Sequence, residues 1–301
     1  MSAGRPLVGG VGISNPQRVI DKASGATKLA LAEYYLAVAD RLVPQLAGRP
    51  LSIVRAPEGV DGESFFQRHC GRLKMPHMHA LPKNLDPEHA RLIQADNITA
   101  AIEAVQMGTV EFHTWNARSD RVERPDRVIF DLDPDPALPW SSMVEATELT
   151  LQLLDDLGLQ AFLKTSGGRG MHVVVPLDRR HDWDLARQFA RSVTERLARE
   201  APELIVDKMG PQNRVGRIFV DYLRNQRGAS TVAAYSVRAR PGLAVSVPVE
   251  REELAQLERA DRWNIGNLDE RLRALRSDPW ARYGAVRQGL TQALLKRLEK
   301  G

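Results

Sequence analysis

Apolar residues recur every three to four positions in several stretches of the chain, which is the period of one face of an α-helix. Leu31, Val38 and Leu42 follow this spacing until the segment "AGRP" interrupts it. Residues 97–108 begin with an asparagine suited to capping a helix and end with a glycine. The pattern predicts helices from about residue 27 to 47, over 97–108, over 141–158 and around positions 185, 189, 193 and 197, with further helices and turns toward residue 301.

Other stretches are continuously apolar or alternate between apolar and polar residues, which predicts β-strands. In "TVEFHTW" the alternation places Glu111, His113 and Trp115 on one face. Strands and helices do not alternate strictly, and the glycines at 167–170 predict a hairpin. We therefore expect an α/β fold with a mixed central β-sheet flanked by helices. The predicted strands cover 51–56, 109–115, 127–133, 161–166, 171–177, 217–223 and 230–240.

The chain length allows one large domain or two small ones behind a short tail. Residues 1–14 are rich in glycine and small side chains, so we expect a flexible tail there. The chain has 301 residues, 43% of them hydrophobic, which is enough for a sizeable core. No internal repeat or low-complexity linker is visible in the remainder, so residues 15–301 are expected to form a single domain.

Composition also excludes several classes of protein. The single cysteine, Cys70, excludes an intrachain disulfide and cysteine-rich zinc sites, so a metal ion would need oxygen or histidine ligands. No apolar run could span a bilayer and the N-terminus lacks a secretory core, which predicts a cytoplasmic protein with no membrane partner. The net charge of +4 and the many arginines permit a nucleic-acid partner without requiring one.

Two aspartates stand at the end of the apolar strand at 128–130. Residues two apart in a strand point to the same side, so Asp131 and Asp133 would lie side by side, with Cα atoms about 7 Å apart. Two carboxylates about 4 Å apart repel by about 4 kcal/mol at an effective dielectric constant near 20, and divalent ions reverse this repulsion. The spacing suits two ions, although a solvated acidic turn is the alternative. Asp135 is not expected to take part, because Pro134 ends the strand.

A glycine-rich loop and a third acid could join this site. In "TSGGRGMH" the glycines allow backbone N–H groups to form a concave anion site, to which Ser166 and Arg169 would add donors, and His172 opens the next strand. A flexible hairpin turn is the plainer alternative. Asp221 ends another apolar strand and either pairs with an arginine at 217, 224 or 227 or joins the metal site.

Two further features suit a DNA partner. Lys28 falls in the first turn of a predicted helix, where a cation opposes the helix dipole unless an anion such as a phosphate binds there; Arg18 is the second cation of this feature. Phe65 and Phe66 belong in the core or, if exposed beside basic residues 68, 72 and 74, form a platform for base stacking. The histidines at 69, 77, 79 and 89 lack a spacing typical of metal ligands and are expected to be structural.

The segments "VIFDLDPD", "TSGGRGMHVVVPL", "IFVDYLRN" and "STVAAYSVRAR" resemble, in order and spacing, the polymerase domain of bacterial ATP-dependent DNA ligase D, of the archaeo-eukaryotic primase superfamily. The resemblance covers about residues 15–297. It implies a primase-like catalytic core and a template-directed nucleotidyltransferase that fills gaps and extends DNA ends in non-homologous end joining, often preferring ribonucleotides and manganese. No ligase motif or phosphoesterase segment is visible, so we expect one domain of a larger end-joining enzyme or a homologue of such a domain.

The resemblance also implies roles for individual residues. Asp131 and Asp133 would bridge two Mn²⁺ or Mg²⁺ ions, and Asp221 would complete the ion that activates the primer 3′-hydroxyl. His113 would contact the sugar of the incoming nucleotide. The residues implied to bind the nucleoside triphosphate are Ser166, Arg169, His172, Arg224 and Arg238, of which positions 169 and 224 vary among relatives.

On the DNA side, the resemblance implies that Arg18 and Lys28 hold the 5′-phosphate beyond a gap. Phe65 and Phe66 would stack against template bases. The implied partners are DNA with 5′-phosphorylated ends or gaps, nucleoside triphosphates, Ku and a ligase module, at the nucleoid of a bacterial cytoplasm.

Two other functions fit parts of the sequence. An apolar strand that ends in Asp-x-Asp also opens haloacid dehalogenase-like phosphatases, where Asp131 would be a covalent nucleophile and Asp133 the acid or base. However, Pro134 and Asp135 replace the residues usual in that family, and the motif lies 130 residues into the chain. A non-catalytic module that binds DNA ends, with structural acids, is the second alternative.

Overall fold

The protein divides into two compact units, each assembled from three segments of the chain. The structure, a computed structural model, describes residues 4–71 and 75–300. Unit 1 comprises Met1–Trp115, Ser230–Ser246 and Trp263–Ala274, and unit 2 comprises Asn116–Ala229, Val247–Arg262 and Leu275–Gly301. The segments of the two units alternate along the chain, so no single boundary in the sequence separates them.

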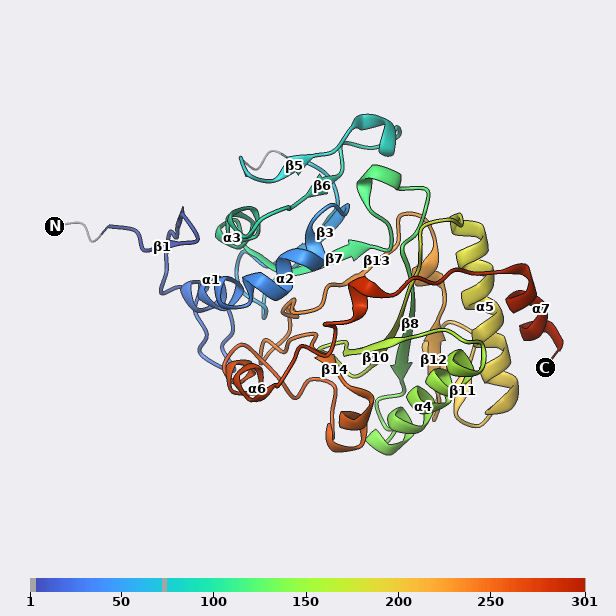
Figure 1. Cartoon of the computed structure of the whole chain (residues 1–301). Helices are drawn as coiled ribbons and strands as arrows, with labels where there is room; N and C mark the ends of the chain where they lie inside the picture. Colours follow the sequence, from blue (N-terminus) through green and yellow to red (C-terminus); the bar gives the residue numbers. More distant parts are fainter. Residues whose placement is uncertain (1–3, 72–74, 301) are drawn as a thin grey trace. The chain divides into compact units, whose positions relative to one another are not determined.

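The sheet of unit 1 is antiparallel at every described pairing (Figure 1). Its strand order is β13-β7-β3-β6-β5, and β4 also pairs with β3. The strands are β3 (Leu51–Arg55), β4 (Phe65–Gln67), β5 (His79–Ala80), β6 (Ile93–Gln94), β7 (Thr109–Trp115) and β13 (Ser230–Val232).

The first helix of unit 1 packs on the sheet through a buried tyrosine. The predicted first helix is divided at Val38, whose backbone leaves the helical range, and Asn97 caps the predicted second one. The Tyr35 hydroxyl donates to the Val110 carbonyl at 2.5 Å, and its ring meets Phe112 edge to face at 5.1 Å. These contacts attach the first helix to β7. The helices are α1 (Lys28–Ala37), α2 (Ala39–Leu46), α3 (Ile98–Gln106), α6 (Leu268–Ala274) and the 3₁₀ turn η1 (Lys83–Leu85).

The N-terminal residues differ from the predicted flexible tail. Leu7–Val8 (β1) pairs with Val11–Gly12 (β2) across a turn in which Gly9 and Gly10 both have positive φ, a conformation that glycine adopts without strain. The Thr99 hydroxyl donates to the Gly9 carbonyl at 3.1 Å, and Ile13 is fully buried. The described part of the predicted tail is therefore a packed hairpin.

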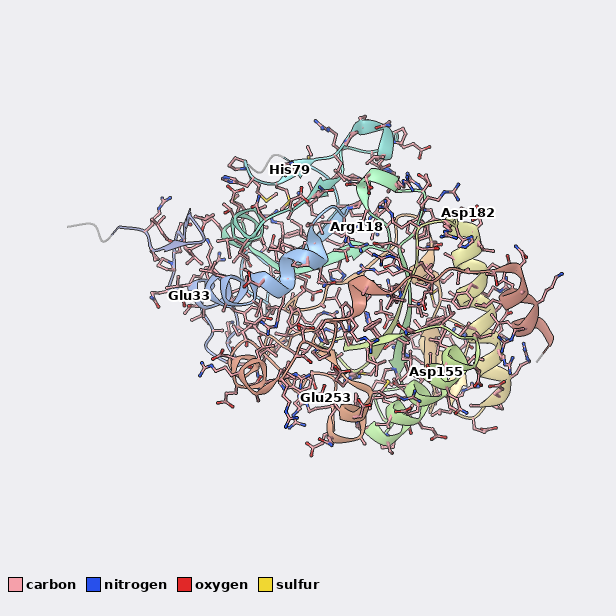
Figure 2. All side chains as sticks on the ribbon, viewed as in Figure 1. Glu33, His79, Arg118, Asp155, Asp182 and Glu253 are labelled. Atoms are coloured by element: carbon pink, nitrogen blue, oxygen red, sulfur yellow. The ribbon has the colours of Figure 1, made fainter. Side chains whose placement is uncertain are left out.

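The sheet of unit 2 is mixed. Its strand order is β11-β12-β8-β10-β9-β14, with a parallel pair β11-β12 and antiparallel pairs elsewhere. Helices α4 and α5 pack against β8, and Asp182 caps the start of α5 by accepting from the Leu185 N–H (Figures 1 and 2). The strands are β8 (Arg127–Pro134), β9 (Phe162–Thr165), β10 (Met171–Pro176), β11 (Ile205–Val206), β12 (Ile218–Asp221) and β14 (Pro248–Val249).

Helices on a mixed sheet confirm the predicted α/β fold. The α-helices of unit 2 are α4 (Trp140–Asp156), α5 (Trp183–Glu200) and α7 (Gln292–Lys300), and its 3₁₀ helices are η2 (Ser119–Arg121), η3 (Pro211–Asn213), η4 (Leu223–Asn225), η5 (Arg251–Gln256) and η6 (Tyr283–Ala285). Within the described residues, none of these helices has the length and apolar character needed to cross a membrane.

Candidate functional site

Three neighbouring strands of unit 2 bring together the predicted acids. Asp131 of β8 lies directly opposite Asp221 of β12 on one side and His172 of β10 on the other. Directly opposed residues in an antiparallel pair have Cβ atoms about 5 Å apart. The buried Phe130 and Leu132 alternate with Asp131 and Asp133, so the two acids share the opposite side of β8.

Two arginines and a histidine surround these acids. Arg224 Nε lies 3.1 Å from Asp221 Oδ2 and 3.5 Å from Asp131 Oδ2. His172 Nε2 lies 3.3 Å from Asp131 Oδ1, and Arg214 forms an ion pair with Asp133. The sequence offered an arginine partner or a metal site as alternatives for Asp221; the structure provides Arg224 as a partner and places Asp221 beside Asp131 as well.

The carboxyl groups of this cluster do not titrate alike. Burial raises the pKa of Asp221, as do the negative charges of Asp131 and Asp133, although Arg224 opposes the rise. The pKa of Asp133 is likewise raised by burial and by Asp131, against Arg214. Burial acts in the same direction on Asp131, but His172 and Arg224 lower its pKa well below the ordinary value. Because burial and neighbouring carboxylates disfavour the ionised forms of Asp133 and Asp221, a divalent cation bound here would stabilise them.

Just before Asp131, the side chain of Asn225 forms the hydrogen bonds with β8 that a neighbouring strand would otherwise form. β12 ends at Asp221, so its backbone pairs with β8 only from Asp131 onward. On the same edge, the buried Asn225 accepts from the Ile129 N–H and donates to the Ile129 carbonyl, both at 2.8 Å. This amide continues the hydrogen-bond ladder and holds the segment of β8 that leads into the acids.

The glycine loop between β9 and β10 is a tight turn. Ser166 Oγ accepts from the N–H groups of Gly168 and Gly170, both at 3.1 Å, so these two N–H groups point at the hydroxyl rather than outward as predicted. A Cβ on Gly170 would lie 2.1 Å from the Leu132 carbonyl, which excludes any larger residue there. Arg169 is exposed and lines a cavity of about 260 Å³ that also borders Asp135.

Asp135, which the sequence analysis excluded from the metal site, has a structural role. β8 continues one residue further than predicted, through Pro134. Proline is tolerated there because it is the last residue of the strand, where the missing N–H removes no hydrogen bond from the middle of the sheet. The Asp135 carboxylate accepts from the N–H groups of Ala137 at 2.8 Å and Gly216 at 2.7 Å. It therefore fixes the turn after the strand.

In unit 1, Glu111 organises two of the predicted nucleotide-binding residues. Glu111 Oε2 lies 2.6 Å from His113 Nε2, and Arg238 Nε lies 3.2 Å from Glu111 Oε1. The Ala239 N–H donates to the same Oε1 at 2.6 Å. Burial opposes ionisation, but the hydrogen bond from His113 and the charge of Arg238 lower the pKa of Glu111 to about 2. Glu111 is thus an ionised anchor for His113 and Arg238.

The aromatic pair of unit 1 is exposed. Phe65 and Phe66 on β4 are 46% and 50% exposed, which contradicts a place in the core. The Arg68 guanidinium lies 5.1 Å from the Phe66 ring centroid, and that ring meets His113 edge to face at 5.8 Å. Of the other basic residues predicted beside the pair, Arg72 and Lys74 lie outside the described residues.

Lys28 is the first residue of α1, as predicted, and is nearly buried, with 4% of its surface exposed. Its Nζ donates to the Ser14 carbonyl at 3.0 Å. Burial and the charges of Arg18 and Arg5 lower the pKa of Lys28 to about 8. These cations form a positive cluster, of which sequence reasoning missed Arg5 because it lies in the predicted tail.

The predicted site residues fall into two groups. Unit 2 contains the three acids with Ser166, Arg169, His172 and Arg224, whereas unit 1 contains His113, Arg238, Arg18, Lys28 and the two phenylalanines. Sequence reasoning also missed Arg214, Glu111 and Lys164. Lys164, opposite His172 and nearly fully buried, had a signal, since a lysine inside an apolar strand is rarely buried without a partner.

Comparisons with known proteins agree with this architecture. The family described as "LigD, primase-polymerase domain" matches residues 27–280. The multifunctional non-homologous end joining protein LigD of Pseudomonas aeruginosa is 56% identical over 300 residues, which are 99% of this chain and 36% of that protein. Its counterpart in Mycolicibacterium smegmatis is 30% identical over 251 residues, 82% of this chain and 33% of that protein. The chain thus spans about a third of the length of these curated relatives.

A solved structure is also similar. The polymerase domain of Mycobacterium tuberculosis ligase D in complex with DNA superposes with a TM-score of 0.83 and 28% sequence identity. The match covers 91% of this chain and 98% of that domain.

Proposed function

The chain belongs to the LigD primase-polymerase domain family, and from this premise we propose that it is a template-directed nucleotidyltransferase that adds nucleotides at DNA ends and gaps during non-homologous end joining. The observation that carries the proposal is the placement of Asp131 opposite Asp221, with Asp133 on the same side of β8. Carboxylates grouped in this way are the oxygen ligands that Mg²⁺ and Mn²⁺ prefer.

We propose Asp131, Asp133 and Asp221 as the ligands of two divalent ions, Mn²⁺ or Mg²⁺. When bound, such ions polarise the α-phosphate and stabilise the charge on the entering and leaving oxygens. The raised pKa values of Asp133 and Asp221 are consistent with this assignment, because burial and neighbouring carboxylates disfavour their ionised forms and a bound cation would stabilise them. The pairing of β8 with β12 fixes the positions of these residues. The proposed reaction requires no nucleophile from the protein.

The incoming nucleotide is assigned to residues around this cluster and to the Glu111 anchor. His172 and Arg224, which both contact Asp131, would bind phosphate oxygens next to the ions. Glu111 fixes the ring of His113, which is proposed to contact the sugar. The remaining proposed triphosphate contacts are Ser166, Arg169 and Arg238.

The DNA is assigned to unit 1. We propose that Arg18 and Lys28, with Arg5 added by the structure, bind a 5′-phosphate. Burial and the charges of Arg18 and Arg5 disfavour the charged form of Lys28, and a dianion would stabilise it. The exposed Phe65 and Phe66 offer ring faces for template bases. Ku, a ligase module, and the preference for ribonucleotides and manganese extend the proposal by resemblance to the larger relatives.

The alternatives are not favoured. The phosphatase reading would make Asp131 a nucleophile, whereas family membership and the pairing of Asp131 with Asp221 support metal binding. One assay separates the functions: a gapped duplex with a 5′-phosphate is offered with Mn²⁺ and labelled nucleoside triphosphate. Primer extension supports the polymerase, phosphate release from small esters supports the phosphatase, and binding without turnover supports the DNA-binding module.

A further inference from the structure

Three potential metal ligands that were given no role above meet in unit 1. Asp86 Oδ2 lies 2.7 Å from His69 Nε2, and Asp86 Oδ1 lies 2.8 Å from His89 Nδ1. The two imidazole rings are stacked, with centroids 5.3 Å apart and an angle of 20° between their planes. One donor atom from each residue lies within 4.8 Å of the other two. Within the part of the chain that the structure describes, no other set of three histidine, cysteine, aspartate or glutamate side chains meets this distance criterion.

The donor set selects a class of ion. Two imidazole nitrogens and one carboxylate oxygen suit first-row divalent transition ions, Zn²⁺ above all, rather than Mg²⁺ or Ca²⁺, which prefer oxygen. In a tetrahedral zinc site with bonds of about 2.0–2.1 Å, the ligand atoms lie about 3.3 Å apart. The observed contacts of 2.7 and 2.8 Å and the limit of 4.8 Å bracket this separation, so small side-chain rotations would admit an ion.

The backbone on both sides of the cluster is held in place. His69 forms a β-bridge with Leu92, and the neighbouring Cys70 N–H donates to the Arg91 carbonyl at 2.7 Å. On the other side, Asp86 ends η1 and its N–H donates to the Lys83 carbonyl at 3.2 Å. The Lys83 ammonium also donates to the His89 carbonyl. The ligands are therefore presented by a defined loop, which lowers the ordering cost of binding an ion.

Other histidines of unit 1 make a different arrangement. His77 pairs with Glu103 at 2.6 Å, and His79, on the strand β5 (Figure 2), lies 3.9 Å from Asp96. Each of these pairs joins one histidine to one carboxylate. Asp86 instead contacts two histidines, one through each carboxylate oxygen. One metal ion could replace the two protons that these hydrogen bonds share.

We propose that His69, Asp86 and His89 bind one Zn²⁺ ion, with a fourth position filled by water. The ion would join the loop at 83–89 to the strand segment that follows β4. His69 lies two residues beyond β4, and the Gln67 side chain at the end of β4 donates to the His69 carbonyl at 3.0 Å. The site would thus anchor the strand that carries Phe65 and Phe66, independently of whether these residues contact a template.

The test is a titration of the full chain with Zn²⁺ against a chromophoric chelator, and with Co²⁺ as a spectroscopic probe. The wild-type chain is compared with His89→Ala and Asp86→Asn, and His79→Ala is the matched control. Any ions held by the acids of unit 2 are common to all four proteins and cancel. We expect the wild type and the control to bind one more ion than the two variants, or to bind it about 100-fold more tightly, with visible Co²⁺ absorption typical of nitrogen ligands.

Equal binding by all four proteins, or no Zn²⁺ and Co²⁺ binding beyond that of the His89→Ala variant, overturns the site. The His89 side chain is 61% exposed, so its removal should leave the fold intact, which circular dichroism verifies. A second readout is the melting temperature: Zn²⁺ should raise it more in the wild type and the control than in the two variants. A rise of equal size in the variants also contradicts the proposal.

Discussion

The acids of unit 2 and the cations of unit 1 are two clusters with the same electrostatic problem and opposite signs. Burial and like charges raise the pKa of Asp133 and Asp221, and burial and like charges lower the pKa of Lys28. In each case the shift disfavours the charged form. The difference lies in the neighbours: arginines partly neutralise the acids, whereas arginines add to the charge around Lys28. A bound cation would stabilise the first cluster and a bound anion the second, and these are the charges of the metal ions and the DNA 5′-phosphate that we propose.

The largest expected effect comes from the acidic cluster. Asp131→Ala should reduce nucleotide addition by about 10³-fold or more, because bound ions supply several kcal/mol of transition-state stabilisation and each 1.4 kcal/mol is a factor of ten. Primer extension on a gapped duplex with Mn²⁺ measures this, while binding to 5′-phosphorylated DNA should be unchanged.

Asp135→Ala is the matched control for Asp131→Ala, because Asp135 belongs to the same segment but holds a turn. It should retain most of the extension activity. Full activity of Asp131→Ala would contradict the assignment of Asp131 as a metal ligand. Loss of DNA binding in that variant would contradict the assignment of DNA binding to the positive cluster of unit 1.

The positive cluster should contribute to binding rather than to chemistry. Lys28→Ala should weaken binding to 5′-phosphorylated gapped DNA by about 10- to 100-fold, since charge-assisted hydrogen bonds contribute about 1.5–3 kcal/mol. Binding to the same duplex without the phosphate should not change, and fluorescence anisotropy on both duplexes provides the measurement.

The exposed Lys22 of the same unit supplies the control for Lys28. Lys22→Ala should alter the affinity for both duplexes slightly and equally. An equal loss on both duplexes with Lys28→Ala would show a general electrostatic contribution and would count against a phosphate pocket.

The smallest expected effect is a pH dependence. Lys28, with a pKa of about 8, is charged below that pH and loses its proton above it. Affinity for the 5′-phosphate should therefore fall as the pH rises through 8, by at most about tenfold per pH unit for one proton. Lys28→Arg keeps its charge throughout this range and should remove the dependence. The same slope in wild type and Lys28→Arg would assign the titration to another group.

Parts of this arrangement could be predicted from local patterns. Alternation within "VIFDLD" placed Asp131 and Asp133 on one side of β8, "IFVD" placed Asp221 at the end of β12, and the helix start placed Lys28 in a first turn. These are short-range signals, since the side-chain direction in a strand or helix follows from neighbouring residues. The mixed sheet followed from the same patterns.

What escaped prediction depends on contacts between distant residues. Arg214 reaches Asp133 from an irregular loop across 81 positions of sequence, and no period marks it. His69 and Asp86 are 17 residues apart and meet through a β-bridge and a 3₁₀ turn. Arg5 was hidden because a glycine-rich segment that suggests flexibility also suits a tight hairpin.

Asn225 lies along one edge of β8, the strand that carries Asp131. Where a neighbouring strand would offer a continuous row of peptide groups, a single side-chain amide supplies one matching donor and acceptor to Ile129. An aspartate cannot supply the donor, and an alanine would leave two buried backbone groups unsatisfied, at about 1–3 kcal/mol each. Few residues can therefore replace Asn225, although it would contact neither metal nor DNA. Substitutions there should disturb the acids by weakening the hydrogen bonds of β8, not by changing the charge of the site.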